Sequence, residues 1–147
     1  MKKVLILNGP NLNLLHLRNS SIYGNLSLEK IHHQCQNLAK EIGVELVFEQ
    51  SNSEGDLINF IHKAVNFIDG IIINPGAYTH TSIAIRDALE IFNGAKIELH
   101  ISNIFKREKF RQHSYCSEVV DAVISGLGSS GYLIALHAIT KLIETKN

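Results

Sequence analysis

The chain has 147 residues, which suits one domain with a single sizeable core, so residues 1–147 are expected to form one domain. Apolar residues make up 45% of it and charged residues 19%, which excludes a disordered chain. The 14 basic and 14 acidic residues give no net charge, so nothing favours nucleic acid as a partner. No apolar run spans a membrane, and Cys35 and Cys116 lack CxxC spacing, so we expect a cytoplasmic protein with reduced thiols.

Apolar segments predict a repeated strand–helix order along the chain. The elements expected, in chain order, are a strand at 3–8, a helix at 28–41, a strand at 44–49, a helix from 54 to about 68, a strand at 70–73, a helix at 81–92, strands at 96–101 and 122–125, and a helix at 131–143. Ser27 and Ser53 are the expected N-caps of the first two helices. The fourth strand is partly alternating, whereas the first and third are apolar throughout, as in strands covered on both faces.

This order predicts an α/β fold with a parallel sheet and right-handed crossovers. Five strands in one short domain fit a flavodoxin-like, doubly wound sheet in three layers, which binds ligands outside the carboxyl ends of its strands. Three polar stretches begin at such strand ends, at residues 9–24, 74–88 and 98–115. Their side chains suit proton removal next to a carbonyl on a small anionic substrate.

The first stretch, 9–24, is a long loop, and long loops in compact domains are usually lids or binding loops. It contains Asn11, Arg18 and Tyr23. A free tyrosine has a pKa near 10 and is a poor base at neutral pH, but a neighbouring guanidinium favours the phenolate. An Arg–Tyr pair on a closing loop therefore predicts a general base. The alternative is a surface tyrosine beside a solvated arginine.

The second stretch joins a strand end to a helix start, where backbone N–H groups attract anions and hydroxyls. Asn74 and His80 have side chains that can bind a substrate there. Asn-Pro-Gly is also a common turn sequence, so plain turn chemistry remains an equal alternative. Asp87, further into the helix, is expected either to be solvated or to pair with Arg86.

Glu98 and His100 lie two residues apart at the end of the fourth strand, which puts both side chains on one face. A carboxylate orients a histidine and favours its charged form, so the pair predicts a general acid. The alternative is a core histidine whose hydrogen bond is satisfied by the glutamate.

The segment after this strand offers donors for an anionic group. Ile101 and Ser102 provide backbone amides at the strand exit. Arg107 and Arg111 lie four residues apart, so they either face one carboxylate or form a solvated cationic face.

GLGSSG at residues 126–131 matches the GxGxxG pattern of dinucleotide-binding loops. No later strand follows to carry the ribose-binding acid, so tight strand–helix packing is the better interpretation. The histidines show no zinc-ligand spacing, and no G-x-S-x-G is present, so we expect neither a metal site nor a serine nucleophile.

The segments GPNLNLL, then Tyr23-Gly24, NPGAYTHTS with IRDA, HISN with REKFRQHSY, and GLGSSGYLIAL follow one another over nearly the whole chain. Together they resemble the type II 3-dehydroquinate dehydratase family. The resemblance implies a single catalytic domain that converts 3-dehydroquinate to 3-dehydroshikimate through an enolate, in the shikimate pathway. It also implies that no metal or organic cofactor is used, and that the protein is a homo-oligomer, a dodecamer built from trimers.

The resemblance also implies residue roles. Tyr23 is the base, Arg18 keeps it ionised, and His100, oriented by Glu98, is the acid. Asn11 holds a water molecule on the enolate. The implied substrate-binding positions are Asn74, His80, Ile101, Ser102, Arg107 near the lid, Arg111, and Asp87, which reaches a neighbouring subunit's site.

The chain departs from the family pattern on the lid, where residues 16–20 read HLRNS in place of Gly-x-Arg-Glu-Pro. The spacing is unchanged, so Arg18 and Tyr23 keep their register, but losing a glycine and a proline alters the backbone angles that the loop tolerates. Three rival hypotheses stay open. They are a non-catalytic module that binds a small anion, a nucleotide-dependent oxidoreductase, and an imine-forming dehydratase that uses Lys106 or Lys109.

Overall fold

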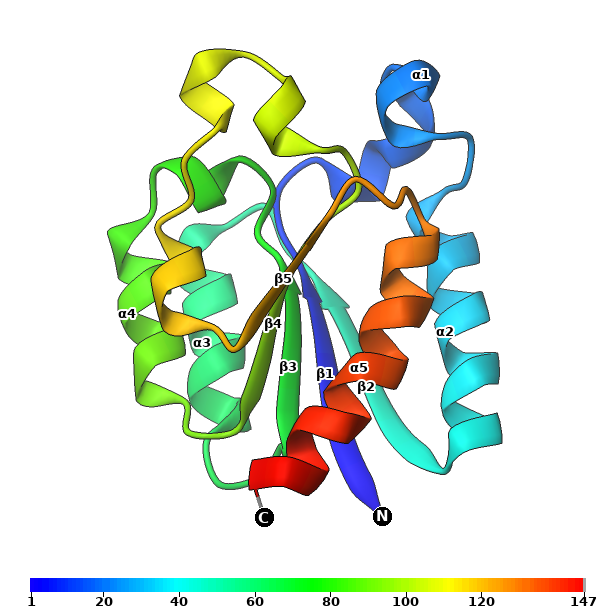
Figure 1. The fold of residues 1–147 in the computed structure, drawn as a ribbon, viewed down its shortest axis with the longest axis vertical. Helices are drawn as coiled ribbons and strands as arrows, with labels where there is room; N and C mark the ends of the chain where they lie inside the picture. Colours follow the sequence, from blue (N-terminus) through cyan, green and yellow to red (C-terminus); the bar gives the residue numbers. More distant parts are fainter. Residues whose placement is uncertain (147) are drawn as a thin grey trace.

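A sheet of five parallel strands forms the centre of the computed structural model, which describes residues 1–146 (Figure 1). The strands are β1 (Lys2–Asn8), β2 (Val44–Gln50), β3 (Gly70–Asn74), β4 (Ala95–His100) and β5 (Ala122–Ser125). Their order is β2-β1-β3-β4-β5, and every neighbouring pair is parallel. This is the doubly wound, flavodoxin-like order, so the fold class expected from the sequence is confirmed.

Helices cover both faces of the sheet, which gives three layers (Figure 1). One face carries α2 (Leu28–Ile42) and α5 (Ser130–Lys146), and the other carries α3 (Glu54–Ala64) and α4 (Ile83–Ile91). Because successive strand residues point to opposite faces, Val4 and Ile6 join the core beneath α2 and α5, whereas Leu5 and Leu7 join the core beneath α3 and α4. No helix among residues 1–146 is long and apolar enough to cross a membrane.

Three helices start with a serine N-cap, and the sequence predicted two of these caps, Ser27 and Ser53. The hydroxyls of Ser27 and Ser53 accept from the backbone N–H groups of Lys30 and Asp56, each at 3.2 Å. A third cap, Ser82, was not foreseen, and it starts α4 two residues later than the predicted 81–92. These bonds satisfy N–H groups that the first turn of a helix leaves unpaired.

The predicted helix 54–68 is too long, because α3 ends at Ala64. Asn66 has a backbone φ of 69°, which a helix cannot accommodate, so the chain turns there. Val65 and Ile68 still pack against the core, but from this turn. The apolar spacing therefore predicted correctly that Val65 and Ile68 face the core, but the prediction that they belong to the helix was wrong.

The partly alternating pattern predicted for the fourth strand does not describe its burial, because every residue of β4 is buried. Lys96 is buried beside the carboxyl end of α4, where its Nζ donates to the carbonyls of Leu89 and Phe92 at 2.8 and 2.7 Å. A cation at the C-terminus of a helix meets the carbonyl groups that the last turn leaves unpaired.

The loops after β1 and β3 meet at the carboxyl edge of the sheet. A Cβ on Gly9 would lie 2.3 Å from the carbonyl oxygen of Pro75, so only glycine permits this approach. The Gly9 amide donates to the carbonyl of Asn74 at 2.8 Å. The first and second polar stretches are thereby brought side by side.

Short helices build the rest of this edge (Figure 1). Between β1 and α2 they are η1 (Leu12–Leu17) and α1 (Ser20–Tyr23), and between β4 and β5 they are η3 (Ile104–Lys106), η4 (Lys109–Arg111) and η5 (Cys116–Val119). The last loop contains the GLGSSG segment. A Cβ on Gly131 would lie 2.9 Å from Leu99, which supports the packing interpretation for this glycine, whereas a Cβ on Gly128 would meet open space.

Candidate active site

A cavity of about 130 Å³ opens at the carboxyl ends of β1, β3 and β4. Its lining includes all the predicted site residues except Glu98 and Asp87, namely Asn11, Arg18, Tyr23, Asn74, His80, His100, Ile101, Ser102, Arg107 and Arg111. The three polar stretches therefore meet as expected. A cavity of this size suits a small molecule rather than a dinucleotide.

Two guanidinium groups hold the Tyr23 hydroxyl. Arg18 Nη2 and Arg107 Nη1 each donate to Tyr23 Oη at 2.5 Å. The guanidinium carbon of Arg18 also lies 3.9 Å from the centre of the tyrosine ring, a cation–π distance. The surface-tyrosine alternative is wrong, since Tyr23 is 8% exposed. The arrangement concentrates positive charge on one phenol oxygen.

Local sequence explains where Tyr23 lies. Asn19 Oδ1 accepts from the Ser21 amide at 3.1 Å and from its hydroxyl at 2.7 Å, which caps the single turn of α1. Gly24, with φ 79°, ends this turn. The unusual lid sequence thus builds a capped helical turn with Tyr23 at its last position.

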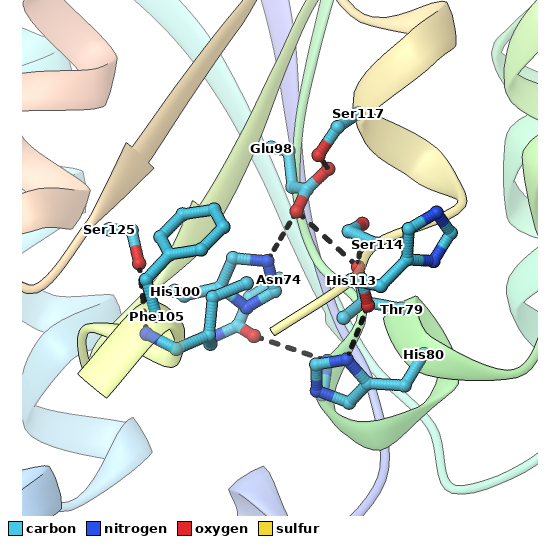
Figure 2. Close-up of polar contacts among 12 residues, drawn as sticks. Asn74, Thr79, His80, Glu98, His100, Phe105, His113, Ser114, Ser117 and Ser125 are labelled. Carbon is cyan, nitrogen blue, oxygen red and sulfur yellow. Dashed lines mark hydrogen bonds and ion pairs between the residues drawn. The ribbon is translucent and has the colours of Figure 1, made fainter. Parts of the chain in front are cut away.

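Glu98 and His100 form a buried pair. His100 Nε2 lies 2.5 Å from Glu98 Oε2, and Ser117 Oγ donates to Glu98 Oε1 at 2.8 Å (Figure 2). Burial by itself raises the pKa of Glu98, but the hydrogen bonds from His100 and Ser117 and the imidazole charge outweigh it, so this pKa lies below its ordinary value. Glu98 is therefore a carboxylate at neutral pH, and His100 turns its Nε2–H toward it.

His80 is the second histidine of the cavity. Its Nδ1 lies 2.7 Å from the carbonyl of His113, so Nδ1 carries the proton and donates (Figure 2). Burial lowers the pKa of His80, and the nearby charges of His100 and Arg111 lower it further. A neutral His80 keeps Nε2 as a hydrogen-bond acceptor.

Asn74 belongs to a buried network that the sequence did not reveal. Its Nδ2 donates to Tyr132 Oη at 3.0 Å, and Tyr132 donates to Asn8 Oδ1 at 2.7 Å. The Asn74 Oδ1 atom accepts from the Gly76 amide at 3.2 Å, as in a turn, and Asn74 also lines the cavity. Both of the alternatives expected for Asn74 therefore apply. Tyr132 and Asn8 are fully buried, and their distance along the chain hid this contact.

Arg107 and Arg111 do share a carboxylate, which is that of Glu108. The Nε atoms of Arg107 and Arg111 lie 3.8 and 2.8 Å from Glu108 Oε2. Both arginines also line the cavity, so the solvated-face alternative is wrong. The contact of Arg107 with Tyr23 was not predicted, because 84 residues separate the two and no local pattern in the sequence relates them.

Asp87 lies outside the cavity. It pairs with Arg86 at 2.9 Å, one of the two expected arrangements, and its side chain is 61% exposed. Among residues 1–146 no group of three or more His, Cys, Asp or Glu side chains is arranged to hold a metal ion.

Fold and site together define a flavodoxin-like α/β protein with ionisable side chains gathered at the carboxyl edge of its sheet. Residues 2–140 match the family model described as dehydroquinase class II. The chain therefore belongs to the class II dehydroquinase family, as the sequence resemblance had indicated.

Individual relatives agree. The 3-dehydroquinate dehydratase of Legionella pneumophila (strain Corby) is 54% identical over 145 residues, which cover 98% of this chain and 100% of the relative. That of Bartonella tribocorum is 52% identical over 144 residues, 97% of each chain. The crystal structure of type II dehydroquinase from Butyrivibrio crossotus aligns with a TM-score of 0.92 at 45% identity, covering 95% of this chain and 97% of that one.

Proposed function

We propose that the protein is a type II 3-dehydroquinate dehydratase, a hydro-lyase that forms 3-dehydroshikimate and water in the shikimate pathway of aromatic amino-acid biosynthesis. Relatives that share about half of its sequence carry this name. The observation that carries the proposal is the Tyr23 hydroxyl, held by Arg18 and Arg107 in the same cavity as the His100–Glu98 pair.

The reaction needs a base and an acid in one elimination. Tyr23, as phenolate, takes a proton from the carbon next to the ketone, and the electron pair moves onto the carbonyl oxygen to form an enolate. When the carbonyl re-forms, the bond between the ring carbon and the hydroxyl breaks. His100 gives that oxygen a proton, so water leaves. Exchange with solvent then removes the proton from Tyr23 and restores that of His100.

Fixed charges favour each step. The guanidinium groups of Arg18 and Arg107 stabilise the phenolate of Tyr23, and the carboxylate of Glu98 stabilises the imidazolium of His100. Asn11 lines the same cavity and is suited to hold a water molecule on the enolate oxygen. Donors that are in place before charge develops need no reorganisation during the reaction.

The remaining lining residues suit an anionic, hydroxyl-rich substrate. Arg111 and the backbone amides of Ile101 and Ser102 are donors for a carboxylate. Neutral His80 offers Nε2 to a substrate hydroxyl, and Asn74 is a rigid partner for another. Binding energy at these groups orients the reacting carbon toward Tyr23.

We further propose that the protein works as a dodecamer built from trimers, in which Asp87 reaches the cavity of a neighbouring subunit. Ile83, Asp87 and Ile91 follow one another at four-residue spacing along α4, so they share one side of it. The two isoleucines are 55% and 58% exposed, which is unusual for large apolar side chains on one stripe. A second copy of the chain on this stripe would cover them.

Residues 1–147 are proposed to act as one catalytic domain in the cytoplasm. The two cysteines support a reducing compartment, because Cys35 and Cys116 are both buried and unpaired. Burial raises the pKa of each thiol to about 12, so neither is a reactive thiolate.

The rival functions explain less of the site. An anion-binding module accounts for the arginines but not for a tyrosine and a buried Glu–His pair facing the same cavity. Of the GLGSSG glycines, Gly131 packs against Leu99 of β4, and no later strand follows within residues 1–146 to carry a ribose-binding acid, so a nucleotide-dependent oxidoreductase has little support. Neither Lys106 nor Lys109 lines the cavity, so an imine-forming route lacks its amine.

The test is an assay of the purified protein with 3-dehydroquinate, following the ultraviolet absorbance of the conjugated enone product. The wild type should turn over with or without a chelator, and Tyr23→Phe should lose roughly 10²-fold to 10⁴-fold in kcat while still binding substrate. Tyr115→Phe, which removes a hydroxyl outside the cavity, is the matched control and should remain active. A folded wild-type protein with no turnover would favour the binding module.

A further inference from the structure

The carboxylate of Glu98 is fully buried, and both of its oxygens have polar neighbours. His100 Nε2 lies on Oε2 at 2.5 Å, and Thr79 Oγ1 makes a longer contact to the same oxygen at 3.4 Å. The other oxygen, Oε1, receives the hydroxyl of Ser117 at 2.8 Å. An ionised carboxylate that has lost its water needs such donors, and Ser117 is the closest neutral one.

Ser117 is brought to Glu98 by the segment between β4 and β5. The neighbouring Cys116 is fully buried in the core beneath α3 and α4, which anchors η5. Glu118 lies 3.5 Å from Arg86 of α4 and adds a second, exposed attachment. Figure 2 shows Glu98 between the imidazole of His100 on one side and the serines of this segment on the other.

The titratable groups that act on Glu98 are few. His100 lies on its own strand, His80 on η2 (Gly76–His80) and Cys116 on η5. The thiol of Cys116 is neutral because burial, together with Glu98, raises its pKa to about 12. His80 is held neutral by its own burial. His100 therefore supplies the charge that pairs with Glu98, and the serine hydroxyls supply uncharged hydrogen bonds.

We infer that Ser117 is a positioning residue for the acid step: its hydroxyl holds the carboxylate of Glu98 ionised and oriented, so that His100 stays correctly placed to protonate the leaving hydroxyl. This inference rests on the proposed function for its kinetic consequence. Its structural part concerns the protonation of Glu98 alone. Nothing in the spacing of Glu98 and Ser117, 19 residues apart, indicates the contact.

The direction of the effect follows from which form the hydrogen bond favours. Ser117 donates to the charged carboxylate, so the bond lowers the pKa of Glu98. Removing the hydroxyl raises that pKa, and Glu98 then takes up a proton at a higher pH. The acid limb of the kcat–pH profile should move upward by roughly half a pH unit to one unit, the usual effect of one hydrogen bond to a charged group.

The experiment compares wild type with Ser117→Ala, Ser117→Thr and Ser27→Ala. At neutral pH, where Glu98 stays ionised, Ser117→Ala should lower kcat by about three- to tenfold because the carboxylate is less well oriented, with little change in KM. At acid pH it should shift the limb upward, because Glu98 takes up its proton more readily. Ser117→Thr keeps the hydroxyl and should restore both. Ser27→Ala removes the N-cap of α2, which lies far from Glu98, so it should lower stability without moving the limb.

A second readout does not depend on catalysis. The infrared band of the protonated Glu98 carboxyl group, assigned by its loss in Glu98→Gln, is followed against pH in wild type and Ser117→Ala. The band should appear at higher pH in Ser117→Ala. An unshifted band, or equal losses of kcat in Ser117→Ala and Ser117→Thr, overturns the inference. If the band shifts between wild type and Ser117→Ala as expected, but the wild type does not turn over 3-dehydroquinate, the proposed function is overturned instead.

Discussion

At the scale of single residues, the phenol oxygen of Tyr23 is the most unusual atom of the site, because two guanidinium groups donate to it. The sequence pairs Tyr23 with Arg18 through their common loop. Arg107 reaches the same oxygen from the far segment after β4. Its other contacts, to Ser102 Oγ at 3.4 Å and to Glu108 Oε2 at 3.8 Å, are longer, so its main partner is the tyrosine.

We expect Arg107→Ala to lower kcat by about ten- to a hundredfold with a small rise in KM, because a charge that acts on Tyr23, the proposed base, matters in the transition state. Steady-state kinetics on 3-dehydroquinate measure both constants. Arg111→Ala is the matched control, since Arg111 lines the cavity without contacting Tyr23, and it should mainly raise KM. If Arg107→Ala changes KM alone, Arg107 binds substrate and does not act on Tyr23.

Glu98 links stability to pH. Its pKa is lower in the folded protein than its ordinary value of 4.5, so the stability it adds is fully present above about pH 4.5 and is lost as the pH falls through the folded pKa. Glu98→Gln should therefore be less stable than wild type at neutral pH, and the difference should shrink below pH 4.5. Urea unfolding at several pH values measures this. A difference that is constant with pH would contradict the direction of the shift.

At the scale of elements, α1 is a single helical turn, too short to be stable by itself. Its cap at Asn19 and the bonds of Tyr23 to two arginines hold it against the sheet. In the HLRNS sequence His16 and Ser20 stand where the family pattern has a glycine and a proline, and Asn19, at the glutamate position, supplies a side-chain cap. Lid motion should depend on that cap.

Asn19→Ala should loosen the lid, since losing an N-cap costs about 1 kcal/mol of local helix stability. We expect kcat to change by a few-fold and proteolytic cleavage between residues 16 and 24 to become faster. Limited proteolysis with mass spectrometry locates the cuts. Asn25→Ala, beyond the end of α1, is the control, and equal cleavage of both variants would argue against a role for the cap.

The first turn of α5 is tied to β1 and β3 by Tyr132. Tyr132→Phe leaves the amide of Asn74 and the carbonyl of Asn8 without this partner in a dry core, which should cost about 1–3 kcal/mol in free energy of unfolding. Chemical denaturation measures that loss. Tyr78→Phe, whose hydroxyl bonds the Asn52 carbonyl near the surface, should cost clearly less. Equal losses would mean that the buried network adds nothing.

At the scale of the whole molecule, the cavity is complete apart from Asp87, which is proposed to come from a neighbour. Tyr23→Phe and Asp87→Asn should each be nearly inactive alone. Unfolded and refolded together, they should regain about a quarter of wild-type activity, since random mixing gives an intact pair at roughly one site in four. Size-exclusion chromatography with light scattering checks the assembly. No regain from correctly assembled mixtures would place Asp87 outside the reaction.

The sequence by itself determined the fold and which polar stretches line the cavity. Alternating strands and helices left few ways to bury the apolar runs, and the parallel order then brought the ends of β1, β3 and β4 to one edge. Glu98 and His100 were predictable as a pair because a strand puts alternate residues on one face. Tyr23 and Arg18 were predictable as one of two alternatives, because they lie five residues apart on the same loop.

Only the tertiary structure decided the contacts between distant segments. Arg107 and Tyr23 are 84 residues apart, and Tyr132 and Asn8 are 124 apart, so no local periodicity relates them. The end of α3 at Ala64 likewise depended on the turn at Asn66, which apolar spacing does not report. These long-range contacts and this helix end could not be predicted from local sequence patterns. They form only when the helices and loops have closed over the sheet, so they depend on the packing of the whole chain.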